Sequence, residues 1–204
     1  DMDGLVKAVM HYAMGDFTAS CRLKAETEFD NKKCFNPYIL LYNKMLGGRT
    51  IILGVSSVWG QFKGLDDLIS LSREPDFLVV LVGLTSEQIN TLQGEKYKEC
   101  NIVPVSRTQN QQELAMVYSM VDVFVNPTYA DMFPTVNLEA LACGTPVVTY
   151  KTGGSPEAID ERTGIVVGQG DVEALAEAIR KMKVSPLSSD DCRKRAEQYF
   201  DKDK

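Results

Sequence analysis

Short apolar runs recur along the chain from residue 50 onward, and amphipathic segments separate them. This alternation constrains the fold more than any other feature, because it is the order of elements in repeated strand–helix units with a parallel sheet. Strands buried on both faces of such a sheet are rich in Val, Ile and Leu throughout. The predicted strands are 50–56, 77–83, 101–106, 122–127, 146–150 and 164–167.

The segments between these runs carry apolar residues at helical spacing. The clearest are 65–73, 87–92, 111–120 and 135–142. We therefore predict an α/β fold with a Rossmann-like parallel sheet flanked by helices, formed by residues 49–204 as one domain. A chain of 204 residues is long enough for one such core and too short for two full α/β domains.

The two ends of the chain resemble each other. Residues 1–9, DMDGLVKAV, align with 171–179, DVEALAEAI, and residues 21–33 align with 192–204. This similarity predicts a diverged internal repeat, in which an extra amino-terminal helical segment, residues 1–48, repeats 171–204. A permuted domain, a tandem fusion or an engineered assembly would each produce it. Self-association through residues 1–46 is a further expectation, because a segment that completes a core can do so in a partner.

Composition excludes several classes of function. A net charge of -6 disfavours a broad phosphate-binding surface, so nucleic acid is not an expected partner. Five cysteines without a CxxC pair, and a single histidine, indicate neither a disulfide framework nor a metal site. We expect no metal ion or other cofactor. No apolar run is long enough to cross a bilayer, and the first residues lack the pattern of a signal peptide.

Residues 130–160, ADMFPTVNLEALACGTPVVTYKTGGSPEAID, have the features of a ligand site. Pro134 stands where a helix begins after a strand and a polar loop, a position that proline favours. The N–H groups of the first turn, from Thr135, would then point out of the carboxyl edge of the sheet and suit a phosphate. Asp131 and Glu139 bracket this turn, and a carboxylate accepts paired hydrogen bonds from vicinal hydroxyls. The segment indicates a ligand with phosphate and sugar hydroxyls.

Simpler roles are open for several of these residues. Asp131 could cap the helix, and Lys63, after the first predicted strand, could be a solvated surface lysine. Gly153 and Gly154 could serve only a sharp turn. Glu139 is harder to explain as structure, because a carboxylate flanked by core residues in LEALACG needs a partner.

The pattern of an acid, seven residues and a glutamate, followed by EALACGTPVV and TGGSPE, resembles the family 4 retaining glycosyltransferases of GT-B fold. The resemblance runs from about Ile51 to Lys204, and residues 1–46 are similar to the same family's terminal helices. It covers most of one half of such an enzyme, the carboxyl-terminal domain that binds the sugar donor. The resemblance therefore implies a nucleoside-diphosphate sugar as ligand.

Carried over by this resemblance, Lys63 is the ligand of the donor's diphosphate and Asp131 contacts hydroxyls of the transferred sugar. These two are the predicted catalytic residues. Asp131 stands where the family usually has glutamate, which shortens its reach by one methylene. Glu139 is predicted to hydrogen-bond the donor's ribose. Pro134 replaces a common glycine and offers no N–H.

Six further residues complete the predicted donor site. They are Phe133, at the family's aromatic position, Thr135, Val136 and Asn137 as backbone donors, and Arg107 and Gly154. Trp59 and Arg107 lie in predicted edge loops, where each could contact the base or the sugar or could only pack.

The resemblance implies retaining transfer of a hexose from a nucleoside-diphosphate sugar to an acceptor glycan or lipid-linked sugar. We expect the chain to be weakly active or inactive without an acceptor domain. We also expect it to be cytoplasmic, and the full enzyme could lie at the inner face of the membrane as a peripheral protein. Two alternatives stay open. One is a non-catalytic fragment or oligomerisation module with a GT-B half fold, and the other is a nucleotide-sugar epimerase or hydrolase on the same half fold.

Overall fold

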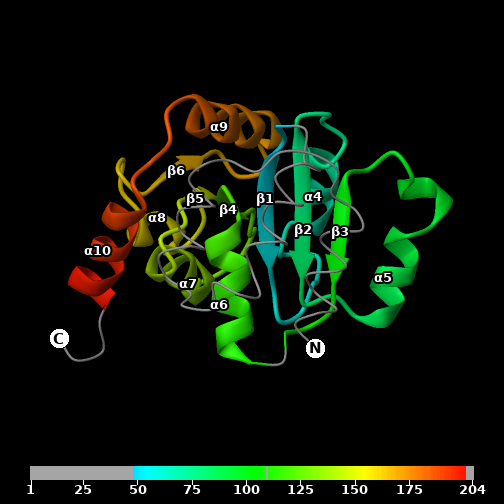
Figure 1. Ribbon diagram of the computed structural model, residues 1–204, viewed down its shortest axis with the longest axis horizontal. Coiled ribbons are helices and arrows are strands. Elements are labelled where there is room, and N and C mark those ends of the chain that lie inside the picture. Colours follow the sequence, from blue (N-terminus) through cyan, green and yellow to red (C-terminus); the bar gives the residue numbers. More distant parts are fainter. Residues whose placement is uncertain (1–47, 109, 201–204) are drawn as a thin grey trace, which may run out of the picture.

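The computed structural model describes residues 48–108 and 110–200, with side chains up to residue 198. In this part of the chain, six parallel strands form one sheet with helices on both faces (Figure 1). The strands are β1 (Thr50–Val55), β2 (Phe77–Val82), β3 (Ile102–Val105), β4 (Val123–Asn126), β5 (Val147–Tyr150) and β6 (Gly164–Val167). Each coincides with a predicted run to within one residue at either end. The predicted amino-terminal helical segment, residues 1–48, lies outside the described residues except for Gly48, so its repeat of 171–204 stays a prediction.

The strand order is β3-β2-β1-β4-β5-β6, so β1 lies at the centre and the chain crosses over it between β3 and β4. Ile52 of β1 pairs with Val79 of β2 on one side and with Val123 of β4 on the other. The carboxyl ends of β1 and β4 are therefore neighbours at the point where the strand order reverses. Open α/β sheets bind their ligands at this switch point.

Seven α-helices and one short 3-10 helix connect the strands in the described part of the chain. They are α4 (Leu65–Leu71), α5 (Ser86–Leu92), η1 (Glu95–Tyr97), α6 (Gln111–Met120), α7 (Thr135–Ala142), α8 (Ser155–Ala158), α9 (Val172–Val184) and α10 (Ser189–Phe200). The bounds of α6 and α7 are those predicted from the sequence. None of the helices described is both long enough and apolar enough to span a membrane.

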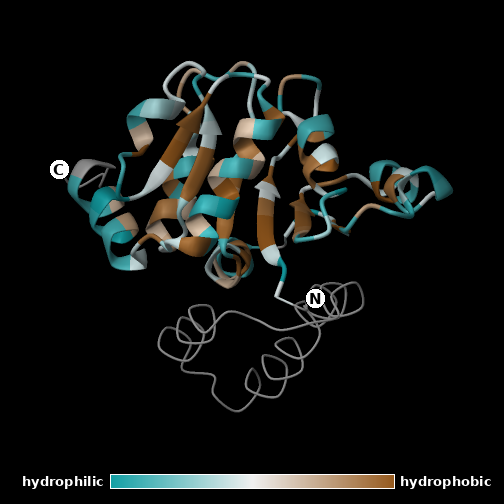
Figure 2. Cartoon of the chain, turned by 90° about the horizontal axis from the view of Figure 1, so that it is seen from above, coloured by the Kyte–Doolittle hydropathy of each residue, from teal (hydrophilic) through white to brown (hydrophobic). Residues whose placement is uncertain are grey.

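The helices divide between the two faces of the sheet. Helices α4, α5 and α9 pack on one face, and α6, α7, α8 and α10 on the other. Side chains of β1 alternate between the two cores: Ile51 and Leu53 pack with α6 and α7, and Ile52 packs with α4 and α9. Figure 2 shows the strands coloured as hydrophobic, with hydrophilic residues on the outer sides of the helices. The predicted α/β fold, a Rossmann-like parallel sheet flanked by helices, is confirmed.

Candidate functional site

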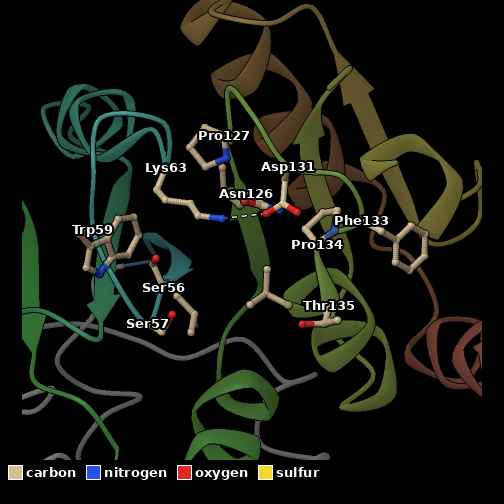
Figure 3. Close-up of a pocket in the computed structure, with 13 residues that line it drawn as sticks. Ser56, Ser57, Trp59, Lys63, Asn126, Pro127, Asp131, Phe133, Pro134 and Thr135 are labelled. Carbon is tan, nitrogen blue, oxygen red and sulfur yellow. Dashed lines mark hydrogen bonds and ion pairs between the residues drawn. The ribbon is translucent and has the colours of Figure 1, made fainter. Parts of the chain in front are cut away.

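A cavity of about 190 Å³ opens at the carboxyl ends of β1 and β4 (Figure 3). The loop between β1 and α4 forms one side of it, and the loop between β4 and α7, with the first turn of α7, forms the other. Its walls are Val55, Ser56, Ser57, Trp59, Lys63, Val125, Asn126, Pro127, Asp131, Phe133, Pro134, Thr135 and Val136. The fold thus brings five of the nine predicted site residues to one cavity: Lys63, Asp131, Phe133, Thr135 and Val136.

Two hydrogen bonds to one backbone carbonyl hold the two loops together. The carbonyl of Phe62 accepts from the N–H of Tyr129 at 2.8 Å and from the hydroxyl of Thr128 at 3.1 Å. Gly64 follows in the left-handed conformation, with φ 66°, where a side chain would run into the carbonyl oxygen of Pro127. Because Lys63 lies between these two fixed residues, its backbone position at the cavity is set by the other loop.

Lys63 and Asp131 form an ion pair across the cavity, with 2.7 Å between Nζ and Oδ2 (Figure 3). Their side chains are 38% and 22% exposed, so both keep contact with solvent. Helix α7 has Pro134 as its N-cap and no side-chain cap, so the alternative that Asp131 caps this helix is wrong. The distance is typical of a charge-assisted hydrogen bond.

The start of α7 differs from the starts of α5, α6 and α9, and like the starts of α4 and α8 it has no side-chain cap. In α5, α6 and α9 the N-cap side chains of Thr85, Asn110 and Asp171 accept a hydrogen bond from the first turn. In α7 the N-cap is a proline, which has no such acceptor. The first N–H groups of a helix have no partner within the helix. Those of Thr135 and Val136, two residues that line the cavity, are therefore available to a ligand.

Asn137 has a different place from its two predicted neighbours. Its N–H donates to the carbonyl of Pro134 at 3.1 Å, and its side chain is fully buried. The side-chain Oδ1 accepts a hydrogen bond from Nδ2 of Asn126, at the end of β4, at 2.8 Å. Asn137 therefore fastens α7 to β4 and does not line the cavity.

The paired glycines after β5 support the loop that carries Asp131. Gly153 has φ 47°, and a side chain there would meet the carbonyl oxygen of Asp131. The N–H of Gly154 donates to the carbonyl of Met132 at 2.8 Å, and a side chain on Gly154 would press against the ring of Phe133. Both glycines are thus explained by close approach to this loop, and the N–H of Gly154 is already in use.

Glu139 lies beside the cavity rather than in its wall. It is the fifth residue of α7, one helical turn after Val136 and on the same side of the helix. Its side chain is exposed, and Oε2 accepts a hydrogen bond from the hydroxyl of Tyr118 at 3.1 Å. The expectation that structure alone does not explain this carboxylate therefore needs correction, because it faces solvent and has a buried partner.

The two remaining candidates, Arg107 and Trp59, follow different strands of the sheet. Arg107 is exposed and follows β3, which lies at the edge of the sheet beyond β2 and does not contribute to the cavity. Trp59 lines the cavity but is 8% exposed, and its indole N–H donates to the carbonyl of Val82 at 3.0 Å. Burial in the core and this hydrogen bond therefore account for most of the surface of the Trp59 side chain.

Sequence reasoning missed some polar residues of the cavity. Ser56 and Ser57 follow β1, and Asn126 ends β4. All three stand at the carboxyl ends of the two central strands, which is the signal that could have identified them. Using that signal requires knowing which two strands are neighbours at the switch point. The sequence does not show this directly, because β1 and β4 are far apart in it.

The arrangement places one cation and an uncapped helix start on opposite sides of one cavity. Both attract an anion, because the N-terminus of a helix carries a partial positive charge. The Asp131 carboxylate beside them accepts hydrogen bonds from hydroxyl groups. The cavity is therefore suited to an anionic group joined to a hydroxyl-bearing one.

A Rossmann-like sheet with such a site at its switch point is the arrangement of a ligand-binding α/β domain. The family model described as "Glycosyl transferases group 1" matches residues 46–199. The chain belongs to the group 1 glycosyltransferases. This confirms the predicted class of protein, a transferase.

Two curated relatives are themselves named as glycosyltransferases. The D-inositol 3-phosphate glycosyltransferase of Mycobacteroides abscessus is 43% identical over 77 residues, which are 37% of this chain and 17% of the relative. The GDP-mannose-dependent alpha-(1-6)-phosphatidylinositol monomannoside mannosyltransferase of Mycolicibacterium smegmatis is 32% identical over 156 residues, or 69% of this chain and 40% of the relative. The chain thus spans less than half of the length of either protein.

Solved structures show the same fold. Sucrose-phosphate synthase from Thermosynechococcus elongatus superposes with a TM-score of 0.66 at 24% identity, over 94% of this chain and 46% of that one. Anabaena HepE in complex with UDP-glucose superposes with a TM-score of 0.62 at 21% identity, over 76% of this chain and 46% of that one. In both cases the matched part of this chain corresponds to about half of the other protein.

Proposed function

We propose that this chain is the donor-binding domain of a retaining hexosyltransferase and holds a nucleoside-diphosphate sugar in the cavity between β1 and β4. The observation that carries the proposal is the position of Lys63 opposite the uncapped first turn of α7. Family membership supports it, as do the complex of Anabaena HepE with UDP-glucose and the GDP-mannose dependence in the name of the mycobacterial relative.

The proposed roles follow from charge and geometry. Lys63 and the N–H groups of Thr135 and Val136 bind the diphosphate, and they stabilise the negative charge that grows on it as the sugar leaves. Asp131 accepts hydrogen bonds from hydroxyls of the transferred sugar, and Glu139 accepts them from the ribose. The fixed positive groups neutralise the leaving group in this scheme, so we propose no divalent metal.

Transfer itself requires more than this domain. An acceptor glycan or lipid-linked sugar must be oriented against the donor, and water must be excluded, which needs a second wall over the cavity. We therefore propose that the chain alone binds donor and transfers sugar slowly or not at all. A second domain or a partner chain would supply the acceptor site.

Calorimetric titration with UDP and with GDP tests the proposal. The chain is expected to bind one of the two, and Glu139→Ala is expected to weaken that binding about tenfold, because a hydrogen bond from the ribose to a charged group is lost. Glu177→Ala, which replaces an exposed glutamate of α9 on the other face of the sheet, is the matched control and should bind as the unaltered chain does. Failure to bind either nucleotide would leave a GT-B half fold without a donor site.

Asp131→Asn is expected to affect the binding of two ligands to different degrees. It removes a negative charge beside the diphosphate and releases Lys63 from its ion pair, so affinity for UDP should rise about two- to fivefold, in line with partly exposed ion pairs. UDP-glucose should gain less, because its sugar hydroxyls lose a charged acceptor. Calorimetric titration of both ligands measures the ratio. Weaker binding of UDP by the variant would mean instead that Asp131 is needed to hold Lys63 in place.

A further inference from the structure

One buried polar group next to the proposed site is not used by the mechanism above. Tyr118 of α6 is 1% exposed, and its hydroxyl lies 3.1 Å from Oε2 of Glu139 and 3.5 Å from the carbonyl oxygen of Val136. Its ring packs edge-on against Phe124 of β4, with 5.4 Å between ring centres. The hydroxyl of Thr145 donates to its backbone carbonyl at 2.7 Å. Tyr118 is thus fixed at its ring and its backbone.

The hydroxyl of Tyr118 has no packing role that a phenylalanine would not fill. Burying a hydroxyl costs free energy unless it is hydrogen-bonded, and here the nearer of its two acceptors is the carboxylate of an exposed glutamate. Burial, and then the adjacent Glu139 carboxylate, raises the pKa of the Tyr118 hydroxyl, so it stays a neutral donor at ordinary pH. A rigid donor beneath a flexible side chain restricts the rotamers of that side chain.

We propose that Tyr118 is a positioning residue for Glu139 and thereby determines how strongly the domain selects the ribose of its nucleotide. The Tyr118 hydroxyl donates its hydrogen bond to Oε2 of Glu139. The other oxygen of the oriented carboxylate, Oε1, is then left to accept hydrogen bonds from the ribose hydroxyls. Glu139 stands one turn along α7 from Val136, a residue of the cavity wall, so its side chain is within one helical turn of the cavity. This inference rests on the proposed function, because it assigns Tyr118 to the same nucleotide site.

The test uses binding of UDP or GDP, whichever the chain binds, and of the 2′-deoxy and 3′-deoxy forms of that nucleotide. Tyr118→Phe is expected to weaken binding of the ribonucleotide about three- to tenfold, because Glu139 is no longer held for the ribose. For the deoxy analogue that lacks the bound hydroxyl, Tyr118→Phe should weaken binding much less. In a Glu139→Ala background, Tyr118→Phe should change affinity by less than about twofold, because the two residues act as one unit.

Tyr150→Phe is the matched control. Tyr150 is also fully buried, and its hydroxyl also donates to a carboxylate, Oδ2 of Asp67 at 2.9 Å, but on the opposite face of the sheet. It should leave the ratio of ribonucleotide to deoxynucleotide affinity unchanged. Thermal unfolding of each variant separates a loss of fold from a loss of selectivity, since selectivity is a ratio measured on folded protein.

Three outcomes would overturn the inference. Unchanged affinity and selectivity in Tyr118→Phe would remove the positioning role and leave the proposed function standing. Equal weakening of all ligands, persisting in the Glu139→Ala background, would make Tyr118 a packing residue only. If the unaltered chain bound neither UDP nor GDP, the proposed function would fail and this inference with it.

Discussion

Lys63→Ala is expected to weaken binding of UDP or GDP by about 10- to 100-fold, the range for a hydrogen bond to a charged group. Among the described residues, the Lys63 side chain is the one cation in the wall of the cavity, and the helix start opposite it supplies only partial charge. Calorimetric titration gives the affinity. Repeating it at rising salt should show a shallower salt dependence in the variant, because a charge–charge contact has been removed.

A second lysine provides the control for charge alone. Lys98 forms an ion pair with Glu95 at 3.4 Å, but both side chains are largely exposed and the pair lies on the surface next to η1. Lys98→Ala should leave nucleotide affinity unchanged. If both lysine variants lost affinity equally, the effect would reflect net charge and Lys63 would have no special role at the diphosphate.

Gly64→Ala is expected to cost about 2–4 kcal/mol of unfolding free energy. The glycine has φ 66°, a conformation that costs other residues about 1–2 kcal/mol, and its new methyl group would collide with the backbone carbonyl of Pro127. Urea unfolding measures the loss. Nucleotide binding should fall as well, because Lys63 immediately precedes the displaced residue.

Gly60→Ala is the matched control in the same loop. An added Cβ at Gly60 meets nothing within 4 Å, and its φ lies outside the left-handed region. The unfolding free energy should change by less than about 0.5 kcal/mol, as at ordinary surface positions. A similar loss in both variants would show that the loop tolerates no substitution, whatever the backbone geometry at Gly64.

The strands were predictable because their signal is local. FLVVLVG and DVFVNP each contain enough adjacent apolar residues to mark a buried strand without reference to the rest of the chain. Helices α6 and α7 were equally clear, because apolar residues at helical spacing continue through each one until a turn follows.

The contacts between residues of the site were harder to predict from the sequence, because they depend on which distant segments of the chain come together. Lys63 and Asp131 were predicted as separate ligands, but their ion pair joins residues 68 positions apart through the neighbouring ends of β1 and β4. The buried partner of Glu139 comes from another helix, 21 positions earlier. Gly154 was predicted as a donor contact, and its tight approach to Phe133 emerges only when the two loops are placed together.

The pairing of β1 with β4 at the centre of the sheet bears on how a ligand at this site affects the stability of the domain. Strand β1 pairs with β2 through six residue pairs but with β4 through only two, Ile52 with Val123 and Leu53 with Phe124. The domain is thus two three-stranded halves joined by a short ladder, and the cavity lies directly over the join. A ligand bound as proposed, by Lys63 on one half and by the start of α7 on the other, links the two halves, so part of its binding free energy stabilises their association.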